Sequence, residues 1–175
     1  MVEKKMKLAE LKLSLREKVL PTDREEVRKI LLSNKYFFDF EIAVAEELIE
    51  ERLARGPASG YHFIFGGIKN RVVGYACYGP IPCTQKSYDL YWIAVSEELR
   101  GQGIGTKILA EAEKAIRKLG GERVYIETSS RPDYDPTRRF YERSGYRLAS
   151  RLDDFYAPGD AKLTWEKHLG ATAKA

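Results

Sequence analysis

The sequence predicts a mixed α/β (α+β) fold in which about seven strands and about four helices follow the order β-αα-βββ-α-β-α-ββ. Short runs of alternating, β-branched and aromatic residues read as strands because side chains alternate across a strand. Longer runs with apolar residues three and four positions apart read as helices. A strand–helix–strand succession over residues 88–128 implies a right-handed crossover, so its two strands should be parallel.

The first third of the chain predicts one strand and two helices. Residues 11–19 alternate apolar and polar side chains, which is typical of a strand. Thr22 and Glu25 have the spacing of a capping box, which predicts that a helix starts there. A second helix should end at Gly56, and its apolar stripe consists of Ile42, Ala45, Ile49 and Leu53.

The middle of the chain predicts three consecutive strands. Residues 61–68 and 71–79 flank Lys69-Asn70, and this arrangement is typical of a hairpin with a short turn. Residues 87–95 follow a proline-containing loop and form the next strand.

The following segment predicts a helix, a strand and a short helix. The first helix has one apolar face, made of Ile104, Ile108, Leu109, Ala112, Ala115, Ile116 and Leu119. Residues 122–130 then read as a strand. In the short helix, Asp135 is the expected cap, Pro136 the expected first residue and Gly145 the expected end.

Two strands over residues 146–156 and 161–169 should close the chain. A chain of 175 residues is long enough for one well-packed domain. We therefore expect a single domain over 1–175, with an N-terminal extension at 1–10 and a C-terminal tail at 170–175.

Composition narrows the class of protein. Apolar residues (43%) and charged residues (32%) occur in globular proportion, so disorder is not expected. The charged N-terminal stretch does not resemble a signal peptide and no apolar run approaches a membrane span, so a cytoplasmic protein without a membrane partner is expected. Cys77 and Cys83 should be reduced, and with only His62 and His168 as histidines a metal site is not expected.

The net charge of +4 is mild. It would help an anionic ligand to approach, but it does not require a nucleic acid. The sequence also lacks a helix-turn-helix or RNP pattern, so a small basic nucleic-acid binder is a weak rival interpretation.

Residues 99–106, LRGQGIGT, place three glycines between a predicted strand and a predicted helix. Such turns bind phosphates because backbone amides converge at the positive end of the helix dipole. A P-loop is excluded because no Gly-Lys pair is present, and GxGxG differs from the dinucleotide fingerprint GxGxxG. The alternative is a tight turn that is merely rich in glycine.

Two motifs favour the interpretation of residues 99–106 as a phosphate-binding turn. Residues 100–105, RGQGIG, fit R/Q-x-x-G-x-G/A and resemble the acyl-CoA-binding motif of the GNAT superfamily of N-acetyltransferases. Residues 140–146, FYERSGY, look like the F-Y-E-K-L-G-F stretch of that family. The predicted order of elements is also that of the family, and the resemblance covers about residues 11–168.

The resemblance implies acetyl-CoA as cosubstrate, bound where two central parallel strands, 88–96 and 123–128, splay apart. Arg100 would supply positive charge near the pyrophosphate. Backbone groups of Ile93 and Val95 would pair with the pantetheine arm. The amides expected to hold the pyrophosphate are those of Gln102, Gly103, Gly105 and Thr106.

Tyr141 matches the tyrosine that serves many family members as general acid, and a phenol suits the protonation of a leaving thiolate. Its alternative role is core packing beside Phe140.

Asp89 matches the carboxylate base of the histone-acetylating branch. Strand alternation should put Asp89 on one face with Tyr91, Ile93 and Val95, and should put Tyr88, Leu90 and Trp92 on the other. The alternative for Asp89 is a strand-end carboxylate that is hydrated or paired with Lys86.

One position departs from the family pattern. Tyr134 stands where many members carry a cofactor-binding asparagine, and the loop before it is about two residues longer. Its hydroxyl could replace the asparagine, or the loop could face the substrate. Aromatic and acidic residues for the acceptor side are available at Tyr36, Phe37, Phe38, Tyr78, Cys83, Asp153, Asp154, Phe155 and Tyr156.

The sequence thus predicts an N-acetyltransferase that moves the acetyl group of acetyl-CoA to a primary amine of a small molecule or a protein. The rival from another class is a non-catalytic acyl-CoA-binding sensor or interaction module on the same fold. Whether the chain acts alone or as a homodimer is left open.

Overall fold

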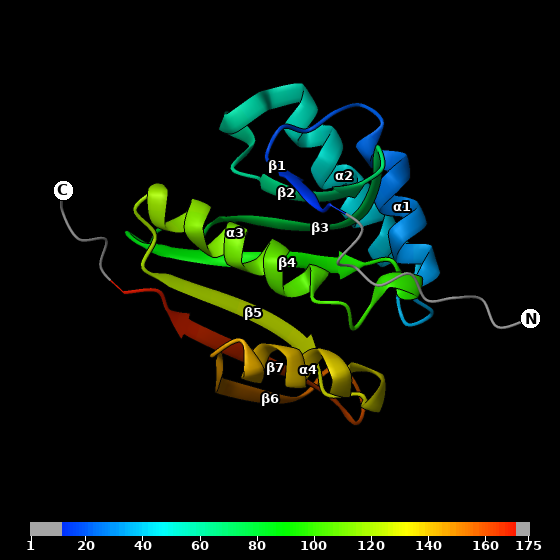
Figure 1. The fold of residues 1–175 in the computed structure, drawn as a ribbon. Helices are drawn as coiled ribbons and strands as arrows, with labels where there is room; N and C mark the ends of the chain where they lie inside the picture. Colours follow the sequence, from blue (N-terminus) through cyan, green and yellow to red (C-terminus); the bar gives the residue numbers. More distant parts are fainter. Residues whose placement is uncertain (1–11, 171–175) are drawn as a thin grey trace, which may run out of the picture. The chain divides into compact units, whose positions relative to one another are not determined.

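The computed structural model of this chain describes residues 12–170. The proposed extension at 1–10, and the tail beyond Gly170, lie outside the described residues. Among the described residues, one sheet contains seven strands in the order β1-β2-β3-β4-β5-β7-β6 (Figure 1). Four α-helices accompany it, and the predicted order of strands and helices is confirmed.

The strands and helices have the following bounds: β1 Ser14–Arg16, α1 Asp23–Ser33, α2 Asp39–Arg55, β2 His62–Ile68, β3 Arg71–Pro80, β4 Ser87–Val95, α3 Ile104–Lys118, β5 Arg123–Ser129, α4 Asp135–Arg143, β6 Arg147–Ala157 and β7 Asp160–His168. Three short 3-10 helices lie at Gly56–Ser59, Glu97–Leu99 and Pro132–Tyr134.

The described residues fall into two compact units. The first unit comprises 12–77 and Trp92–Glu111, and the second comprises Tyr78–Tyr91 and 112–170. Three elements, β3, β4 and α3, therefore contribute residues to each unit. The single domain over the whole chain stays a prediction.

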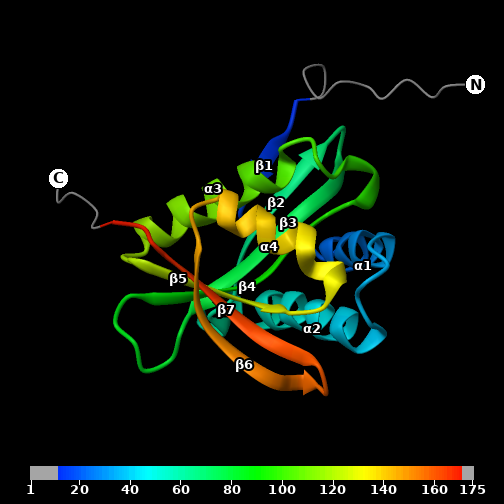
Figure 2. The ribbon, with the colours of Figure 1, turned by 90° about the horizontal axis from the view of Figure 1, so that it is seen from below.

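In the first unit, α1 and α2 lie side by side (Figure 2). Their apolar faces form one buried cluster with Phe63 and Phe65 of β2 and with Tyr75 and Cys77 of β3. The helical members of this cluster are Val27, Ile30, Leu31, Ile42, Ala45 and Ile49. Burial of this apolar surface is the main stabilising contribution to this half of the sheet.

The opposite face of β2 and β3 is shaped for α3. A Cβ atom at Gly66 would lie 3.0 Å from Cδ1 of Ile108, and one at Gly74 would lie 2.9 Å from the same atom. Any larger residue at Gly74 would also meet the backbone oxygen of Ala94 at 3.0 Å. These two glycines therefore let the helix approach the strands closely.

Two sequence predictions for the first unit need correction. Thr22 does not cap α1, because its backbone is already helical (φ −70°, ψ −18°) and its side chain makes no capping hydrogen bond. Instead, the Asp23 carboxylate accepts a hydrogen bond from the Leu20 amide at 2.7 Å and pairs with Arg16. Leu53 was expected in the buried stripe of α2, but it lies 41% exposed in the last turn.

The predicted hairpin is confirmed. Lys69 and Asn70 have left-handed backbones, with φ of 48° and 64°, as a tight two-residue turn requires.

In the second unit, β4 and β5 are parallel, as the crossover predicted. Their register pairs Ser87 with Arg123, Tyr88 with Val124 and Asp89 with Tyr125. Both strands continue in this unit beyond the last of these pairs, and β5 remains antiparallel to β7 over its whole length. One face of this sheet is apolar and buried, with Val124, Ile126, Leu163 and Trp165.

Residues of β4 contact different elements in the two units. In the second unit, Tyr88 of β4 and Ile116 of α3 both lie within 2.7 Å of the position that a Cβ of Gly121 would occupy, so Tyr88 faces this helix. In the first unit, Trp92 of β4 packs against the α1–α2 cluster. The alternation expected over residues 88–95 as a whole stays a prediction.

The ends of α3 and α4 also differ from the prediction. Leu119 lies beyond the last residue of α3 and is 50% exposed. Asp135 is the first residue of α4 and makes no capping hydrogen bond, because the 3-10 turn at Pro132–Tyr134 already leads into the helix. The carboxylate of Asp135 pairs with Arg138. Gly145 follows the helix with φ of 86°, as expected.

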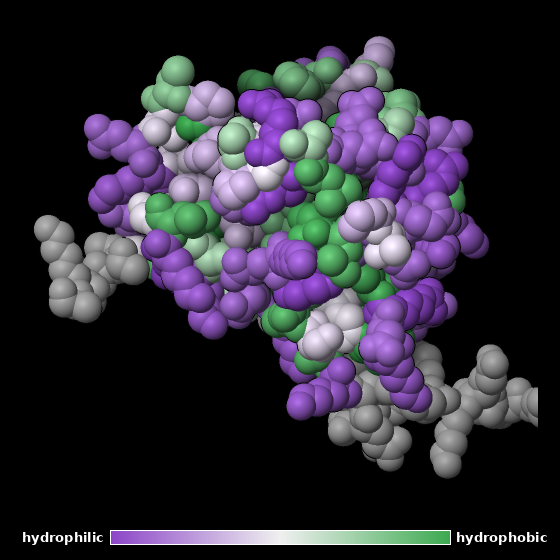
Figure 3. All heavy atoms as spheres, turned by 90° about the horizontal axis from the view of Figure 1, so that it is seen from above, coloured by the Kyte–Doolittle hydropathy of each residue, from purple (hydrophilic) through white to green (hydrophobic). Residues whose placement is uncertain are grey.

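Hydrophilic side chains cover most of the face drawn in Figure 3, and a hydrophobic area lies near its middle. None of the helices within residues 12–170 combines the length and the apolar character needed to cross a bilayer.

A buried ion pair connects three elements of the second unit. Glu113 of α3 is 6% exposed, and both of its carboxylate oxygens accept hydrogen bonds from Lys167 Nζ of β7, at 2.8 and 2.9 Å. The Tyr146 hydroxyl donates to the same carboxylate at 3.0 Å, and Lys167 also donates to the Ser144 carbonyl at 2.8 Å. Burial and the neighbouring carboxylate raise the pKa of Tyr146, so the phenol remains a donor.

We expect Glu113→Ala to destabilise the protein by about 3 kcal/mol, because it leaves the Lys167 ammonium and the Tyr146 hydroxyl without their shared acceptor. Chemical denaturation measures the change. The matched control is Glu51→Ala, which removes the exposed pair of Glu51 with Arg55 and should cost no more than about 0.5 kcal/mol. Equal losses in the two variants would contradict the assigned role.

Candidate active site

The segment between β4 and α3 forms a turn that only glycine adopts readily. Gly101 and Gly103 have φ of 74° and 80°, in the left-handed region, and α3 begins at Ile104. A Cβ atom at either glycine would meet no atom within 4 Å, so the backbone conformation and not crowding by the described residues requires glycine. The first amides of an α-helix have no acceptor within the helix, so this turn presents hydrogen-bond donors at the positive end of α3.

Asn34, at the end of α1, anchors this turn. Its side-chain amide donates to the Val95 carbonyl at 3.1 Å and to the Ile30 carbonyl at 2.8 Å, and the residue is 2% exposed. Its oxygen accepts a hydrogen bond from Arg100 Nη1 at 3.4 Å. The Arg100 guanidinium also lies 5.6 Å from the centre of the Tyr36 ring. Sequence reasoning missed Asn34, because nothing in the local pattern connects it to a residue more than sixty positions later.

The first unit therefore brings together most of the predicted cofactor-binding residues. Ile93 and Val95 belong to the end of β4, and Val95 already uses its carbonyl in the contact with Asn34. The other predicted residues of this unit lie in the turn and the first turn of α3, namely Arg100, Gln102, Gly103, Gly105 and Thr106, whereas Tyr134 belongs to the second unit.

Tyr141 lies on α4 in the second unit and is 4% exposed. Its ring centre is 5.3 Å from that of Phe140 and 5.7 Å from that of Tyr146. Its carbonyl accepts a hydrogen bond from the Tyr146 amide at 3.0 Å. The ring is thus packed, as the alternative interpretation expected, while a chemical role for the hydroxyl stays a prediction.

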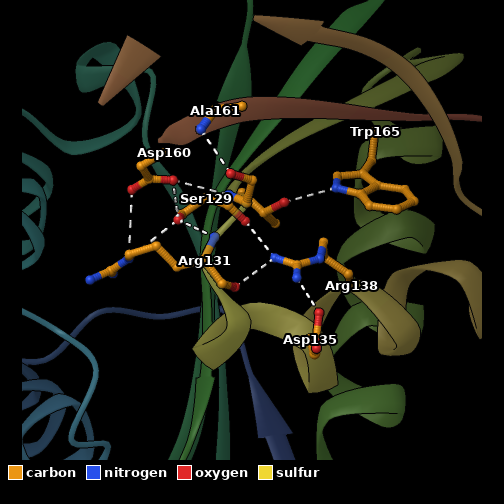
Figure 4. A network of polar contacts seen from close by, with 9 residues as sticks. Ser129, Arg131, Asp135, Arg138, Asp160, Ala161 and Trp165 are labelled. Atoms are coloured by element: carbon orange, nitrogen blue, oxygen red, sulfur yellow. Dashed lines mark hydrogen bonds and ion pairs between the residues drawn. The ribbon is translucent and has the colours of Figure 1, made fainter. Parts of the chain in front are cut away.

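A polar network holds the loop that leads from β5 into α4 (Figure 4). Arg138 donates to the carbonyls of Ser129 and Arg131, at 2.7 and 2.9 Å. Asp160, at the start of β7, accepts hydrogen bonds from the Ser129 hydroxyl at 2.6 Å and the Ser130 amide at 3.1 Å. This loop is therefore fixed from two sides.

Tyr134 sits in the held loop. The guanidinium of Arg131 lies 5.5 Å from the centre of its ring, and its amide donates to the Arg131 carbonyl at 3.0 Å. These contacts place Tyr134 just before α4. Whether it contacts a cofactor in place of the family's asparagine stays a prediction.

Asp89 is half-buried on β4 and faces away from α3, since its neighbour Tyr88 faces that helix. Burial raises the pKa of the Asp89 carboxyl, the nearby charge of Glu127 raises it further, and the charge of Lys162 lowers it. The alternative partner, Lys86, pairs with Glu122. Sequence reasoning missed Glu127 and Lys162, because the register of β5 with β7 brings them to Asp89.

The residues considered for the acceptor side are divided between the two units. Tyr36, Phe37 and Phe38 belong to the first unit, where Phe37 lies 5.6 Å from Trp92 between ring centres. The others belong to the second unit. There Cys83 is exposed with φ of 64°, and the rings of Phe155 and Tyr156 meet edge-on with centres 5.0 Å apart.

Within residues 12–170, no group of three or more His, Cys, Asp or Glu side chains is arranged to hold a metal ion.

The seven-stranded mixed sheet is shared with a solved structure that is described as a GNAT-family acetyltransferase. The family model described as "Acetyltransferase (GNAT) family" matches residues 24–146, and the chain belongs to this family of acyltransferases.

Known relatives agree with this assignment. An N-alpha-acetyltransferase of Sulfurisphaera tokodaii is 28% identical over 137 residues, which cover 77% of this chain and 79% of the relative. A crystal structure of a protein described as a GNAT-family acetyltransferase, from Desulfovibrio desulfuricans, has a TM-score of 0.89 and 42% identity, covering 91% of this chain and 100% of the other. An aminoglycoside 6'-N-acetyltransferase solved with coenzyme A shares the fold, with a TM-score of 0.72 and 16% identity over 93% and 99% of the chains.

Proposed function

We propose that this protein transfers the acetyl group of acetyl-CoA to a primary amine of a small molecule or a protein, by direct attack of the amine on the thioester. The observation that carries the proposal is the glycine turn of residues 100–105 at the start of α3, in a chain of this family. Two positive-φ glycines and a helix N-terminus form the kind of backbone that binds a pyrophosphate.

In this proposal the amides of Gln102, Gly103, Gly105 and Thr106 bind the pyrophosphate. Arg100, oriented by Asn34, adds positive charge. Ile93 and Val95 bind the pantetheine arm through their backbones. Val95 contributes its amide, because its carbonyl already accepts a hydrogen bond from the Asn34 side chain. A backbone amide that also polarises the thioester carbonyl would stabilise the charge that develops on its oxygen.

The proton transfers are assigned to two side chains of the second unit. Asp89 accepts the proton that the attacking amine must lose, and Tyr141 protonates the CoA sulfur as the C–S bond breaks. A carboxyl group whose pKa is raised by burial is a stronger base than an exposed aspartate, so burial suits Asp89 to this role. The Tyr134 hydroxyl is the proposed substitute for the family's asparagine at the cofactor.

The acceptor is an amine that is cationic in water. The name of the Sulfurisphaera tokodaii relative supports an α-amino group as acceptor, and the name of the aminoglycoside enzyme supports a sugar amine. The first comparison carries more weight because it rests on higher sequence identity. A cytoplasmic location and the oligomeric state stay predictions from the sequence.

The experiment that tests the proposal follows release of free thiol from acetyl-CoA with peptides that carry a free N-terminus and with aminoglycosides. We expect turnover with at least one of these amines and a product that is heavier by one acetyl group. Tight binding of acetyl-CoA with no turnover on any amine would instead support the non-catalytic sensor.

We expect Gly103→Val to abolish acetyl-CoA binding in a folded protein, because a branched residue cannot adopt φ of 80° and the turn would lose its shape. Isothermal titration calorimetry measures the affinity. The matched control is Gly120→Val, because Gly120 has φ of 86° and equally open space, at the other end of α3. Unchanged affinity in folded Gly103→Val would show that the pyrophosphate binds elsewhere.

We expect Tyr141→Phe to lower kcat about 10²-fold or more, since it removes the proposed acid and almost no volume from a packed site. The value of kcat/KM should fall with it, while the acetyl-CoA affinity and Tm stay close to wild type. An acyl donor with a more acidic leaving thiol should reduce the deficit, because its sulfur needs less protonation. A near wild-type kcat would leave Tyr141 with core packing alone.

A further inference from the structure

Three ionisable side chains share one face of the sheet in the second unit. Asp89 pairs in register with Tyr125, so their side chains lie on the same face, and Glu127 follows two positions along β5. Glu127 in turn pairs with Thr164 of β7, and Lys162 lies two positions before Thr164. Alternation therefore brings Asp89, Glu127 and Lys162 together on the face opposite to the buried side chains of Ile126, Leu163 and Trp165.

Lys162 is held in a defined position on this face. Its ammonium lies 2.9 Å from Oε1 of Glu127 and 4.2 Å from the centre of the Phe155 ring. Its side chain is only 16% exposed, whereas lysines normally extend into solvent. A carboxylate on one side and an aromatic face on another fix the cation more firmly than an exposed ion pair would.

The charges around Asp89 can be named element by element. On β5, Tyr125 is its register partner and the charge of Glu127 acts on it, and on β7 the charge of Lys162 acts on it with the opposite sign. The part of β3 that belongs to this unit, residues 78–80, contains no charged side chain, and its one titratable group is the phenol of Tyr78. The Lys86 ammonium, on the residue before β4, pairs with Glu122.

We propose that Lys162 and Glu127 are positioning residues for the acceptor side of the reaction: the Glu127 carboxylate favours the protonated form of Asp89, the Lys162 ammonium favours the ionised form, and their ion pair fixes both charges and thereby sets how readily Asp89 accepts a proton. This inference rests on the proposed function, and in particular on Asp89 as the base. As the amine nitrogen forms its bond to the acetyl carbon, its proton passes to Asp89. The electrons of the breaking C–S bond stay on sulfur, which takes its proton from Tyr141.

The arrangement also favours one class of acceptor. When ionised, Asp89, Glu127 and Lys162 together carry one net negative charge, and the neighbouring Glu166 is paired with Arg147. An amine that arrives as a cation is therefore attracted to these three side chains.

Two substitutions test the proposal because they act in opposite directions. Lys162→Met removes the charge that favours ionised Asp89, so the pKa of Asp89 should rise and activity should be lost at a higher pH as the solution is acidified. Glu127→Gln removes the charge that disfavours ionised Asp89, while the charge of Lys162 still favours it. The pKa of Asp89 and the pH at which activity is lost should therefore both move to lower values. Each shift should be on the order of half a pH unit.

The measurements are a carboxyl NMR titration of Asp89 in the protein without substrate and the pH profile of kcat/KM. In the double variant that combines Lys162→Met with Glu127→Gln, the Asp89 titration and the pH profile should both return towards those of the wild type. The matched control is Glu166→Gln, since Glu166 lies on the same face of β7 opposite Tyr125 but pairs with Arg147, and it should shift neither. Thermal unfolding confirms that each variant is folded.

An unshifted Asp89 titration in both Lys162→Met and Glu127→Gln would overturn the positioning role, whatever the enzyme's activity. A shifted titration with an unshifted activity profile would show that Asp89 is not the base, and the role would fall with that part of the proposed function. If Glu127→Gln lost turnover while Asp89→Asn retained it, Glu127 itself would be the proton acceptor. That result would also overturn the positioning role.

Discussion

The close approach of α3 to the sheet is the constraint on which the rest of the structure depends. Gly66 and Gly74 leave room for Ile108, which lets the first turns of the helix lie flat on β2 and β3. The same helix then supplies Glu113 to the second unit. In the first unit this packing holds the start of α3, where its N-terminal amides are presented, and in the second unit Glu113 of α3 binds Lys167 of β7 and Tyr146.

Two glutamate–lysine ion pairs of the second unit have different roles because their surroundings differ. The pair of Glu113 and Lys167 is buried and satisfied by Tyr146 and Ser144, so its removal is costly and its role is structural. In the pair of Glu127 and Lys162, the Glu127 side chain is 50% exposed to solvent, and the charges of both residues act on Asp89. Such a pair contributes little stability, but it can set the charge of a neighbouring group.

The fold was predictable from the sequence because the glycines, the hairpin turn and the apolar periodicity act locally. The order of elements, the parallel crossover and the turn at Lys69-Asn70 are all confirmed. The errors lie at Thr22, Leu53, Asp135 and Leu119, where the helix ends are decided by the chain that enters or leaves the helix.

For the site, the sequence by itself determined the glycine turn after β4, since left-handed backbone is a local property of glycine. It also indicated the tyrosine and the aspartate of the proposed chemistry, by resemblance to the family. Only the tertiary structure showed that Asn34 anchors the turn and that Lys162 and Glu127 lie beside Asp89. Those contacts join residues more than thirty positions apart, and strand register and helix packing, which no local pattern encodes, bring them together.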